Sequence, residues 1–354
     1  MEKFLEMLTF MRPAFNPYDD AFITKYIDVH NPNVDGFGNR WLDVGANEPT
    51  IVWSSHTDTV HNRGGFQNVV VDKKHVVRVA PKQRDSNCLG ADCTTGVWLM
   101  LEMIEAGVPG RYIFHRQEED GGLGSQWIKK NTPELLRGIQ AAIAFDRKGT
   151  NEIITEQGMI PTASKAFAAS LAKLLGGSYR ASPNGSYTDT KEYRALVPEC
   201  TNLAVGYQNA HTGRETQDLK HLKWLRDVLC SLTQEQLDTL VIERDMTQPD
   251  PVYKSYRAWD DQDWDDFGYR RPRAPTTVED LCRQYPNTLS RVLEAHGLDF
   301  AYLQNEVESA LGAPARSKAA ANPLRLPAPT TQPLNLQNAH VGRYASTKVV
   351  SNAA

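Results

Sequence analysis

The chain has 354 residues, 40% of them hydrophobic, and a formal net charge of −4, which allows a sizeable core and gives no sign of a general nucleic-acid or membrane-surface protein. Its five cysteines are scattered and include no CxxC pair, which argues against a disulfide framework and against a cysteine-ligated zinc site. The N-terminal stretch lacks the apolar core of a signal peptide, and no segment reaches membrane-spanning length. We therefore expect a soluble, cytoplasmic protein with neither a nucleic-acid nor a membrane partner.

Short apolar runs alternate with helical sequence over the first two thirds of the chain. The run at 51–55 (IVWSS) is typical of a buried strand, and 161–175, which ends before Gly176, is typical of a helix. This alternation predicts an α/β fold with a mixed, largely parallel sheet. In chain order we expect helical sequence over 1–30, a turn at 35–39, strands at 40–44 and 51–55, a hairpin over 67–80, a helix over 94–106, a strand at 111–116, a helix over 124–136, strands at 139–145 and 153–154, a helix over 161–175, a strand at 201–207 and a helix over 216–232.

The chain changes character after residue 240. Residues 241–276 are rich in Pro, Asp and aromatic residues and predict an acidic, aromatic linker or arm. Residues 277–312 regain helical periodicity and predict a small helical module, and 313–354 have the composition of a disordered tail. We thus expect one large domain over 1–240, and we regard 241–312 as a candidate surface for a protein partner.

Five short segments contain the side chains that could support catalysis, and the strands that precede several of them place those side chains at strand ends. In open α/β sheets ligands bind beyond the carboxyl ends of the strands, so we expect these segments to meet there. Two imidazoles and three carboxylates can hold two divalent metals about 3.5–4 Å apart, and a further carboxylate remains to move protons. The segments are Ser55–Asp58, Gly90–Asp92, Glu118–Gly121, Phe145–Arg147 and Asn209–His211. They predict a hydrolase with a paired-metal centre.

Each segment has a simpler interpretation when it is taken alone. With nine His and 43 acidic residues, an HxD triplet is expected by chance in many chains. Asp92 would serve as a helix N-cap, the Glu118–Glu119 pair as a solvated acidic turn, and His211 as a loop histidine. Asp146 is harder to explain, because an acid that closes so apolar a run needs a partner such as Arg147 or a metal. The joint pattern, and no single segment, carries the prediction.

Taken together, the segments resemble the zinc peptidase superfamily that includes the M20 and M28 metallopeptidases. The family pattern runs HxD, GADD, EExGxxGS, Asp and His, and here the corresponding sequence is HTD, GADC, EEDGGLGS, Asp146 and His211. The resemblance covers about residues 15–232. It implies a three-layer αβα sandwich, a catalytic domain over 1–240, hydrolysis of amide bonds, and two Zn²⁺ ions as cofactors, with Mn²⁺ or Co²⁺ as alternatives.

The resemblance also implies a role for each site residue. In the family one Asp bridges the two metals, each metal has two further ligands, and a Glu acts as general base. Carried over to this chain, Asp92 bridges the metals, His56 and Asp146 complete one of them, Glu119 and His211 complete the other, Glu118 is the general base, and Asp58 orients His56 from behind.

Some features depart from the family pattern, and others indicate which members of the family the chain resembles more. Cys93 stands where the family often has a second Asp, which is not usually a ligand, so we expect metal binding to survive. The peptide bond after the bridging Asp is often cis in the family, which here is Asp92–Cys93. M20 members insert a lid domain between the last two ligands, whereas only 64 residues lie between Asp146 and His211. We therefore expect an M28-like unit without a lid, acting as an aminopeptidase on small peptides; Asp at 146 in place of Glu favours the same activity.

Two other functions stay open. An N-acyl-amino-acid deacylase or a carboxypeptidase would use the same metal site on an acylated amino acid or peptide, with Arg147, Arg180 or Arg214 binding the substrate carboxylate. A catalytically degenerate peptidase fold would serve only in binding, although the presence of both glutamates in the EEDG segment argues against this. The segment Ser186–Thr190 resembles a family segment on the substrate side, and a helix N-cap is its simpler interpretation.

Overall fold

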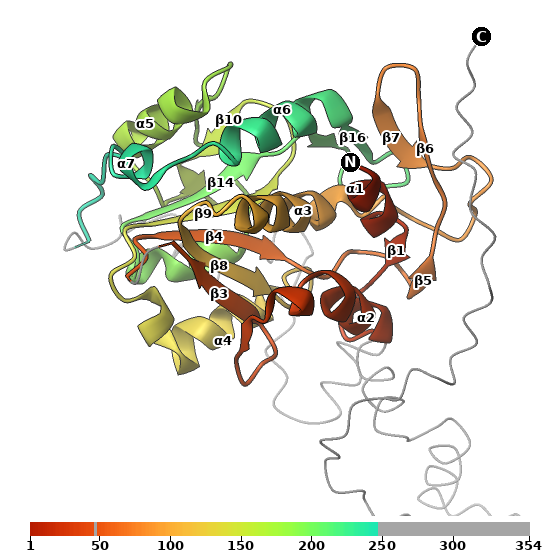
Figure 1. The fold of residues 1–354 in the computed structure, drawn as a ribbon, viewed down its shortest axis with the longest axis horizontal. Coiled ribbons are helices and arrows are strands. Elements are labelled where there is room, and N and C mark those ends of the chain that lie inside the picture. Colours follow the sequence, from red (N-terminus) through yellow and green to blue (C-terminus); the bar gives the residue numbers. More distant parts are fainter. Residues whose placement is uncertain (46–47, 247–354) are drawn as a thin grey trace, which may run out of the picture. The chain divides into compact units, whose positions relative to one another are not determined.

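An eight-stranded mixed sheet forms the centre of this computed structural model, which describes residues 1–45 and 48–246 (Figure 1). Parallel pairings join β4 to β8 and β9, β9 to β14, and β10 to β13, and the other neighbours are antiparallel. From one edge to the other the strands are β13 (Arg180–Ser182), β10 (Glu152–Ile154), β14 (Glu199–Ala204), β9 (Ala141–Arg147), β4 (Ile51–His56), β8 (Gly110–His115), β3 (Arg40–Val44) and β2 (Asn33–Val34). The predicted mixed, largely parallel sheet is confirmed.

The central strands are buried on both faces, because successive residues of a strand point to opposite sides of the sheet. On β4, Ile51 and Trp53 belong to the larger of two hydrophobic clusters, and Val52 belongs to the smaller. On β9, Ile143 and Ala142 divide in the same way. A sheet with two apolar faces needs helices on both sides.

Helices cover the two faces and complete the three-layer αβα sandwich. Figure 1 shows α3, α5 and α6 on one side of the sheet and α4 on the other. The larger cluster takes residues such as Trp98 of α3 and Leu222 of α6, and the smaller takes Ile128 of α4. The helices on the first face are α1 (Glu2–Met7), α3 (Ala91–Glu105), α5 (Lys165–Leu175) and α6 (Leu219–Leu229), and on the second α4 (Leu123–Asn131) with the 3₁₀ helices η2 (Pro133–Leu136) and η3 (Asp189–Ala195).

Smaller elements surround the sandwich. A four-stranded sheet of order β15-β16-β7-β6 contains the predicted hairpin, whose strands β6 and β7 pair on either side of residues 72–75. The other short elements are β1 (Phe10–Met11), α2 (Pro17–Tyr26), η1 (Asp28–His30), β5 (Gly65–Phe66), β6 (Val69–Val71), β7 (Val76–Val79), β11 (Glu156–Gln157), β12 (Ile160–Pro161), β15 (Tyr207–Gln208), β16 (Thr216–Asp218) and α7 (Gln234–Leu237). Among the described helices, none combines the length and the apolar character that crossing a membrane requires.

The helix expected over 124–136 ends at Asn131, after which η2 follows, and the strand expected at 201–207 spans Glu199–Ala204. Three other predicted elements are changed by strand pairing. The expected helix over 161–175 begins only at Lys165, where the Ser164 hydroxyl accepts a hydrogen bond from the Phe167 N–H, because Ile160–Pro161 pairs as a strand. The expected helix over 216–232 begins at Leu219, since the three residues before it join the four-stranded sheet as β16. The helical sequence over 1–30 is interrupted by β1. In each case strand pairing overrides a local helical pattern.

The described residues belong to one compact unit, Met1–Lys254. All residues between Asp146 and His211 are described, and they supply β10, α5, β13 and β14 of the sandwich itself, so this segment contains no inserted lid domain. The predictions for 277–312 and 313–354, and nearly all of that for 241–276, lie outside the described residues.

Candidate metal centre

The first group of candidate ligands meets where two neighbouring parallel strands end. His56 is the last residue of β4, Asp146 lies near the end of β9, and these strands pair in register at Ser54 and Ala144. Asp92 comes from the first turn of α3, just after Gly90, whose φ of +71° allows the sharp entry into the helix. The Nε2 atom of His56 lies 3.1 Å from Asp92 Oδ1 and 3.5 Å from Asp146 Oδ1.

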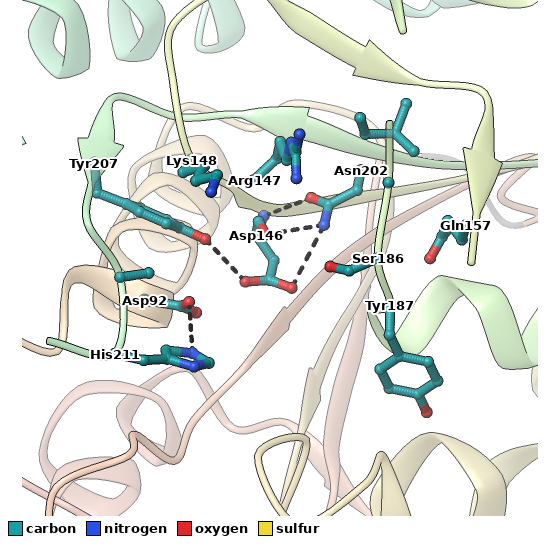
Figure 2. Close-up of a pocket in the computed structure, with 13 residues that line it drawn as sticks. Asp92, Asp146, Arg147, Lys148, Gln157, Ser186, Tyr187, Asn202, Tyr207 and His211 are labelled. Carbon is teal, nitrogen blue, oxygen red and sulfur yellow. Dashed lines mark hydrogen bonds and ion pairs between the residues drawn. The ribbon is translucent and has the colours of Figure 1, made fainter. Parts of the chain in front are cut away.

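The second group shares Asp92 with the first. His211 Nε2 lies 3.1 Å from the other Asp92 oxygen, Oδ2, and 3.1 Å from Glu119 Oε1 (Figure 2 shows Asp92 facing His211). The two oxygens of one carboxylate therefore face two different histidines. His211 holds its position on a loop with a φ of +65°, and about half of its side chain is exposed.

The donor atoms of both groups fit divalent cations. Metal–ligand bonds of about 2.0–2.1 Å in tetrahedral geometry separate ligand atoms by about 3.3 Å, close to the distances within each group. Among the described residues, the buried Glu119 Oε1 faces only the His211 ring, at 3.1 Å and outside good hydrogen-bond geometry, and a metal bound between the two would give it a partner. His56, Asp92 and Asp146 could thus hold one cation, and Asp92, Glu119 and His211 a second.

The electrostatics of the site show an excess of buried acid. Burial raises the pKa of Glu118 well above its usual range, that of Glu119 to about 7 and that of Asp146 to about 6, with neighbouring carboxylates adding to each shift. Hydrogen bonds to Asp92 and Glu119 raise the pKa of His211 to about 11. Burial opposes ionisation of Asp92, but the two imidazoles outweigh it and hold its pKa below the usual range. The imidazoles thus partly offset a charge that cations would balance.

Asp58 positions the glutamate pair as well as His56. Its carboxylate is completely buried and accepts the backbone N–H groups of Glu118 at 3.1 Å and of Glu119 at 3.2 Å. The nearest acceptor to His56 Nδ1 is the Asp58 backbone carbonyl at 3.0 Å, with the carboxylate at 3.6 Å. The predicted side-chain contact is therefore longer than a hydrogen bond, and the backbone takes its place.

Asp146 is held in place by two residues that the sequence did not indicate. The Tyr207 hydroxyl donates to Asp146 Oδ1 at 3.1 Å (Figure 2). The Asn202 side chain accepts from the Asp146 N–H at 2.9 Å and donates to its carbonyl at 2.8 Å. Asn202 lies on β14, the parallel neighbour of β9, and Tyr207 lies just beyond it. Only the pairing of these two strands could have revealed that both residues reach Asp146.

Glu215 is a further residue that the sequence did not reveal. Its buried carboxylate accepts three backbone N–H groups, from Leu89 and Gly90 at 2.8 Å and from Asp92 at 3.1 Å. Four residues earlier the same loop carries His211. Glu215 therefore ties the loop of one candidate ligand to the backbone of the shared one.

Cys93 behaves as a structural thiol. Burial raises the pKa of its thiol, and the thiol donates to the Phe145 carbonyl at 3.1 Å and lies 2.8 Å from the Ser55 hydroxyl. A cysteine binds metal as a thiolate, so these contacts fit the expectation that Cys93 is not a ligand. The Asp92–Cys93 peptide bond is cis, as the family resemblance led us to expect. All four cysteines in the described residues are free thiols.

A polar cavity of about 220 Å³ opens beside the centre (Figure 2). Asp92, Asp146 and His211 line one part of it, and Ser186 and Tyr187 line another. The segment Ser186–Thr190 therefore does reach the candidate substrate side. Its simpler interpretation is weakened, because Thr188 precedes η3 without a side-chain capping hydrogen bond.

No family model and no curated protein matches the sequence. Among solved structures, the chain is similar to aminopeptidase PepT from Bacillus cereus, with a TM-score of 0.52 and 15% identity over 67% of this chain and 97% of that chain. It is also similar to a tripeptidase from Staphylococcus aureus, with a TM-score of 0.55 and 14% identity over 67% of this chain and 97% of that chain. At such identities the likeness concerns the fold: a mixed, mostly parallel sheet between helices, as in the zinc exopeptidase-like α/β proteins.

Proposed function

We propose that this chain is a metal-dependent hydrolase of amide bonds in small peptides, acting as an aminopeptidase. The observation that carries the proposal is the sharing of Asp92 between two groups of donor atoms, with His56 and Asp146 on one side and Glu119 and His211 on the other. A single buried carboxylate that faces two histidines through its two oxygens is the arrangement that a paired-metal centre requires.

Two divalent cations bound there, most simply Zn²⁺ with Mn²⁺ or Co²⁺ as alternatives, would supply Lewis acidity at the scissile carbonyl and make water a better nucleophile. The chain itself would keep the ligands in place. Tyr207 and Asn202 hold Asp146, Glu215 holds the backbone of Asp92, and Asp58 holds the loop of Glu119.

Glu118 is the proposed general base. Its side chain is partly buried beside the candidate ligands, and its backbone N–H is fixed by Asp58. Neighbouring side chains diverge along a chain, so Glu118 can face the reacting water while Glu119 faces the cation. A carboxylate so placed takes a proton from water and delivers it to the leaving nitrogen.

Two features of the cavity favour small peptides with a free amino group. Its volume lies below the range of about 300–1,000 Å³ that is typical of pockets for larger ligands. Its acid-rich end suits a cationic amine. The deacylase alternative named three arginines as carboxylate partners, and none of them favours it: Arg147 is held by Glu152 at 2.8 Å, and neither Arg180 nor Arg214 lines the cavity. The two similar structures, one of an aminopeptidase and one of a tripeptidase, agree with this choice.

The adjacent glutamates allow a matched test. The full chain, purified without chelator, is analysed for metal, and tripeptides and N-acyl amino acids are offered as substrates with products identified by mass spectrometry. We expect about two metals per chain and release of the N-terminal residue. Glu118→Gln should keep the metal and lower kcat about 10²- to 10⁴-fold. Glu119→Gln should lose metal as well as activity.

The alternatives have distinct outcomes. Release of the C-terminal residue, or cleavage of N-acyl amino acids alone, would replace the aminopeptidase by a carboxypeptidase or deacylase. A chain that contains no metal and takes up none when zinc is added would contradict the catalytic proposal, and would favour a binding function of a degenerate peptidase fold.

A further inference from the structure

One buried side chain of the cavity wall has an acceptor without a donor. Gln157, on β11, is 1% exposed and lines the cavity, and its Oε1 has no hydrogen-bond partner among the described residues. Figure 2 shows its side chain on the cavity wall, apart from the candidate ligands. Buried polar atoms of native proteins are nearly always paired, so an unpaired one beside a cavity indicates a ligand group that pairs with it.

The orientation of this amide follows from its neighbours. The Gln157 Nε2 lies 3.3 Å from the Thr190 hydroxyl oxygen and 3.4 Å from that of Thr162. Thr190 donates its own proton to the Thr201 carbonyl at 3.1 Å, so its oxygen can only accept from Gln157. The NH₂ group therefore faces the threonines, and Oε1 is the atom left for a donor in the cavity.

The same cavity is lined by one cation without an acidic partner. Arg147 forms an ion pair with Glu152, which also accepts from the Ser182 hydroxyl. The next residue, Lys148, lines the cavity with an exposed side chain, and no acid in the described part of the chain pairs with it. A ligand carboxylate would find its counter-charge at Lys148.

We infer that this cavity binds the C-terminal residue of a short peptide, with its carboxylate at Lys148 and its amide N–H at Gln157 Oε1. The inference rests on the proposed function and names its substrate class. With the carboxylate at Lys148 and the C-terminal amide N–H at Gln157, the amino end of the peptide is left to extend towards Asp92, Asp146 and His211, which line another part of the cavity. The small volume of the cavity, about 220 Å³, favours short peptides such as di- and tripeptides.

The carboxylate contact is tested with a tripeptide offered as the free acid and as the C-terminal amide. The wild-type chain should prefer the free acid about tenfold in kcat/KM, mainly through KM, because a charge-assisted contact is lost in the amide. In Lys148→Met this ratio should fall to about one. The control is Lys165→Met, which removes an equal charge from an exposed position outside the cavity and should keep the wild-type ratio.

The amide contact is tested with a tripeptide whose third residue is N-methylated. This change removes one N–H and leaves the first peptide bond, the one that an aminopeptidase cleaves, as it was. The wild-type chain should bind the methylated peptide several-fold more weakly, and Gln157→Met should bind both peptides alike. Thermal unfolding of each variant shows whether it is folded.

The results separate the inference from the function on which it rests. If both free acid and amide are cleaved at equal kcat/KM, the C-terminal subsite is wrong and the aminopeptidase stands. If neither is cleaved by metal-loaded protein, the proposed function is wrong. In that case the Kd values of free acid and amide on the metal-loaded Glu118→Gln chain decide the subsite, and equal values overturn it.

Discussion

Two buried clusters of charge lie on either side of residues 57–58, and they differ in how their charges are balanced. The Arg12 network consists of the buried Arg12 and Asp19 with Arg116 and, at its edge, the exposed Asp20; Arg116 lies 3.0 Å from Asp19 and 2.7 Å from Asp20. The candidate metal centre has five carboxylates and two imidazoles, namely Asp58, Asp92, Glu118, Glu119 and Asp146 with His56 and His211.

The contrast separates a structural cluster from a functional one. A buried charge is costly unless it is paired, and in the Arg12 network two guanidinium groups face two carboxylates, with Arg116 paired to both acids and Arg12 bonded to the Thr57 carbonyl and the Thr94 hydroxyl. The same chain leaves the candidate centre with five carboxylates and only two imidazoles. Burial raises the pKa of Asp19 in the Arg12 network to about 6, as it does that of Asp146, so the count of charges and not the pKa separates the two clusters. Binding of cations is the simplest balance. The two clusters should therefore respond in opposite ways to mutation and to metal.

The largest expected effect is the loss of Arg12. Its guanidinium is completely buried, donates to the Thr57 carbonyl and, at 2.8 Å, to the Thr94 hydroxyl, and lies 3.9 Å over the Phe22 ring. Arg12→Met leaves these acceptors unpaired and should lower the free energy of unfolding by about 3–5 kcal/mol. Urea denaturation measures this loss, which should be the same with and without chelator.

The control for this prediction is Arg137→Met at an exposed position, where we expect a change of less than about 0.5 kcal/mol. If Arg12→Met lost no free energy of unfolding once zinc was removed, the stabilities of the two clusters would be coupled. The contrast between them would then be wrong.

Metal removal should act on the centre alone. At a free zinc concentration one hundred times Kd, each bound cation adds about 2.7 kcal/mol to the free energy of unfolding, so chelation should lower Tm and added zinc should restore it. Asp92→Asn should abolish the response, because it alters the carboxylate that both groups share. Asp19→Asn should lower Tm but keep the response to zinc. A response retained by Asp92→Asn would place the cations elsewhere.

The fold was largely predictable from the sequence because apolar runs and strand ends are local signals. The runs at 51–55 and 139–145 are buried strands of the sheet, and the turn at 35–39 closes through Asp35, which accepts the N–H groups of the three residues from 37 to 39. The errors fall where strand pairing displaced helical sequence: β12 pairs with the nearby β11 in a tight hairpin, and β16 pairs with the distant β7.

The candidate ligands could be found because their residue types are distinctive and each follows a predicted element. Their supporting residues could not, because hydrogen bonds over long separations leave no local pattern. Asn202 contacts Asp146 from the neighbouring strand, and Glu215 contacts Asp92 although the two residues are more than one hundred positions apart in the sequence. Gln157 and Lys148 are ordinary surface-type residues in the sequence, and only the cavity makes them notable.

Glu215 gives a further test of how the two clusters differ, because it is a buried acid whose carboxylate is stabilised by backbone N–H groups. In Glu215→Gln an NH₂ group replaces one acceptor and faces a backbone N–H, which should cost about 1–3 kcal/mol of unfolding free energy. Since Glu215 orients Asp92, metal affinity should also fall about 10- to 100-fold. Titration of the metal-free chain with zinc measures this, with the exposed Glu235→Gln as control. Unchanged metal affinity in a less stable variant would make Glu215 purely structural.

The smallest effect concerns His61, which adjoins the Arg12 network through Thr59. Its ring lies 2.7 Å from the Thr59 hydroxyl, and burial, with the nearby Arg12 charge, lowers its pKa to about 4. The folded chain therefore keeps His61 neutral, whereas the unfolded chain protonates it near pH 6.5. Stability should fall as pH is lowered from about 6.5 towards 4, by about 1–2 kcal/mol between pH 7 and 5.

Wild-type and His61→Gln chains, both unfolded by urea at pH 7 and pH 5 with chelator present, isolate this contribution. Both chains contain the same titrating acids in the centre, so the contribution of these acids cancels when the stability losses of the two chains are compared. The wild-type chain should lose more stability on acidification than the variant does. An equal loss would mean that His61 gains a proton without cost beside Arg12, and that the network carries less positive charge than its two arginines suggest.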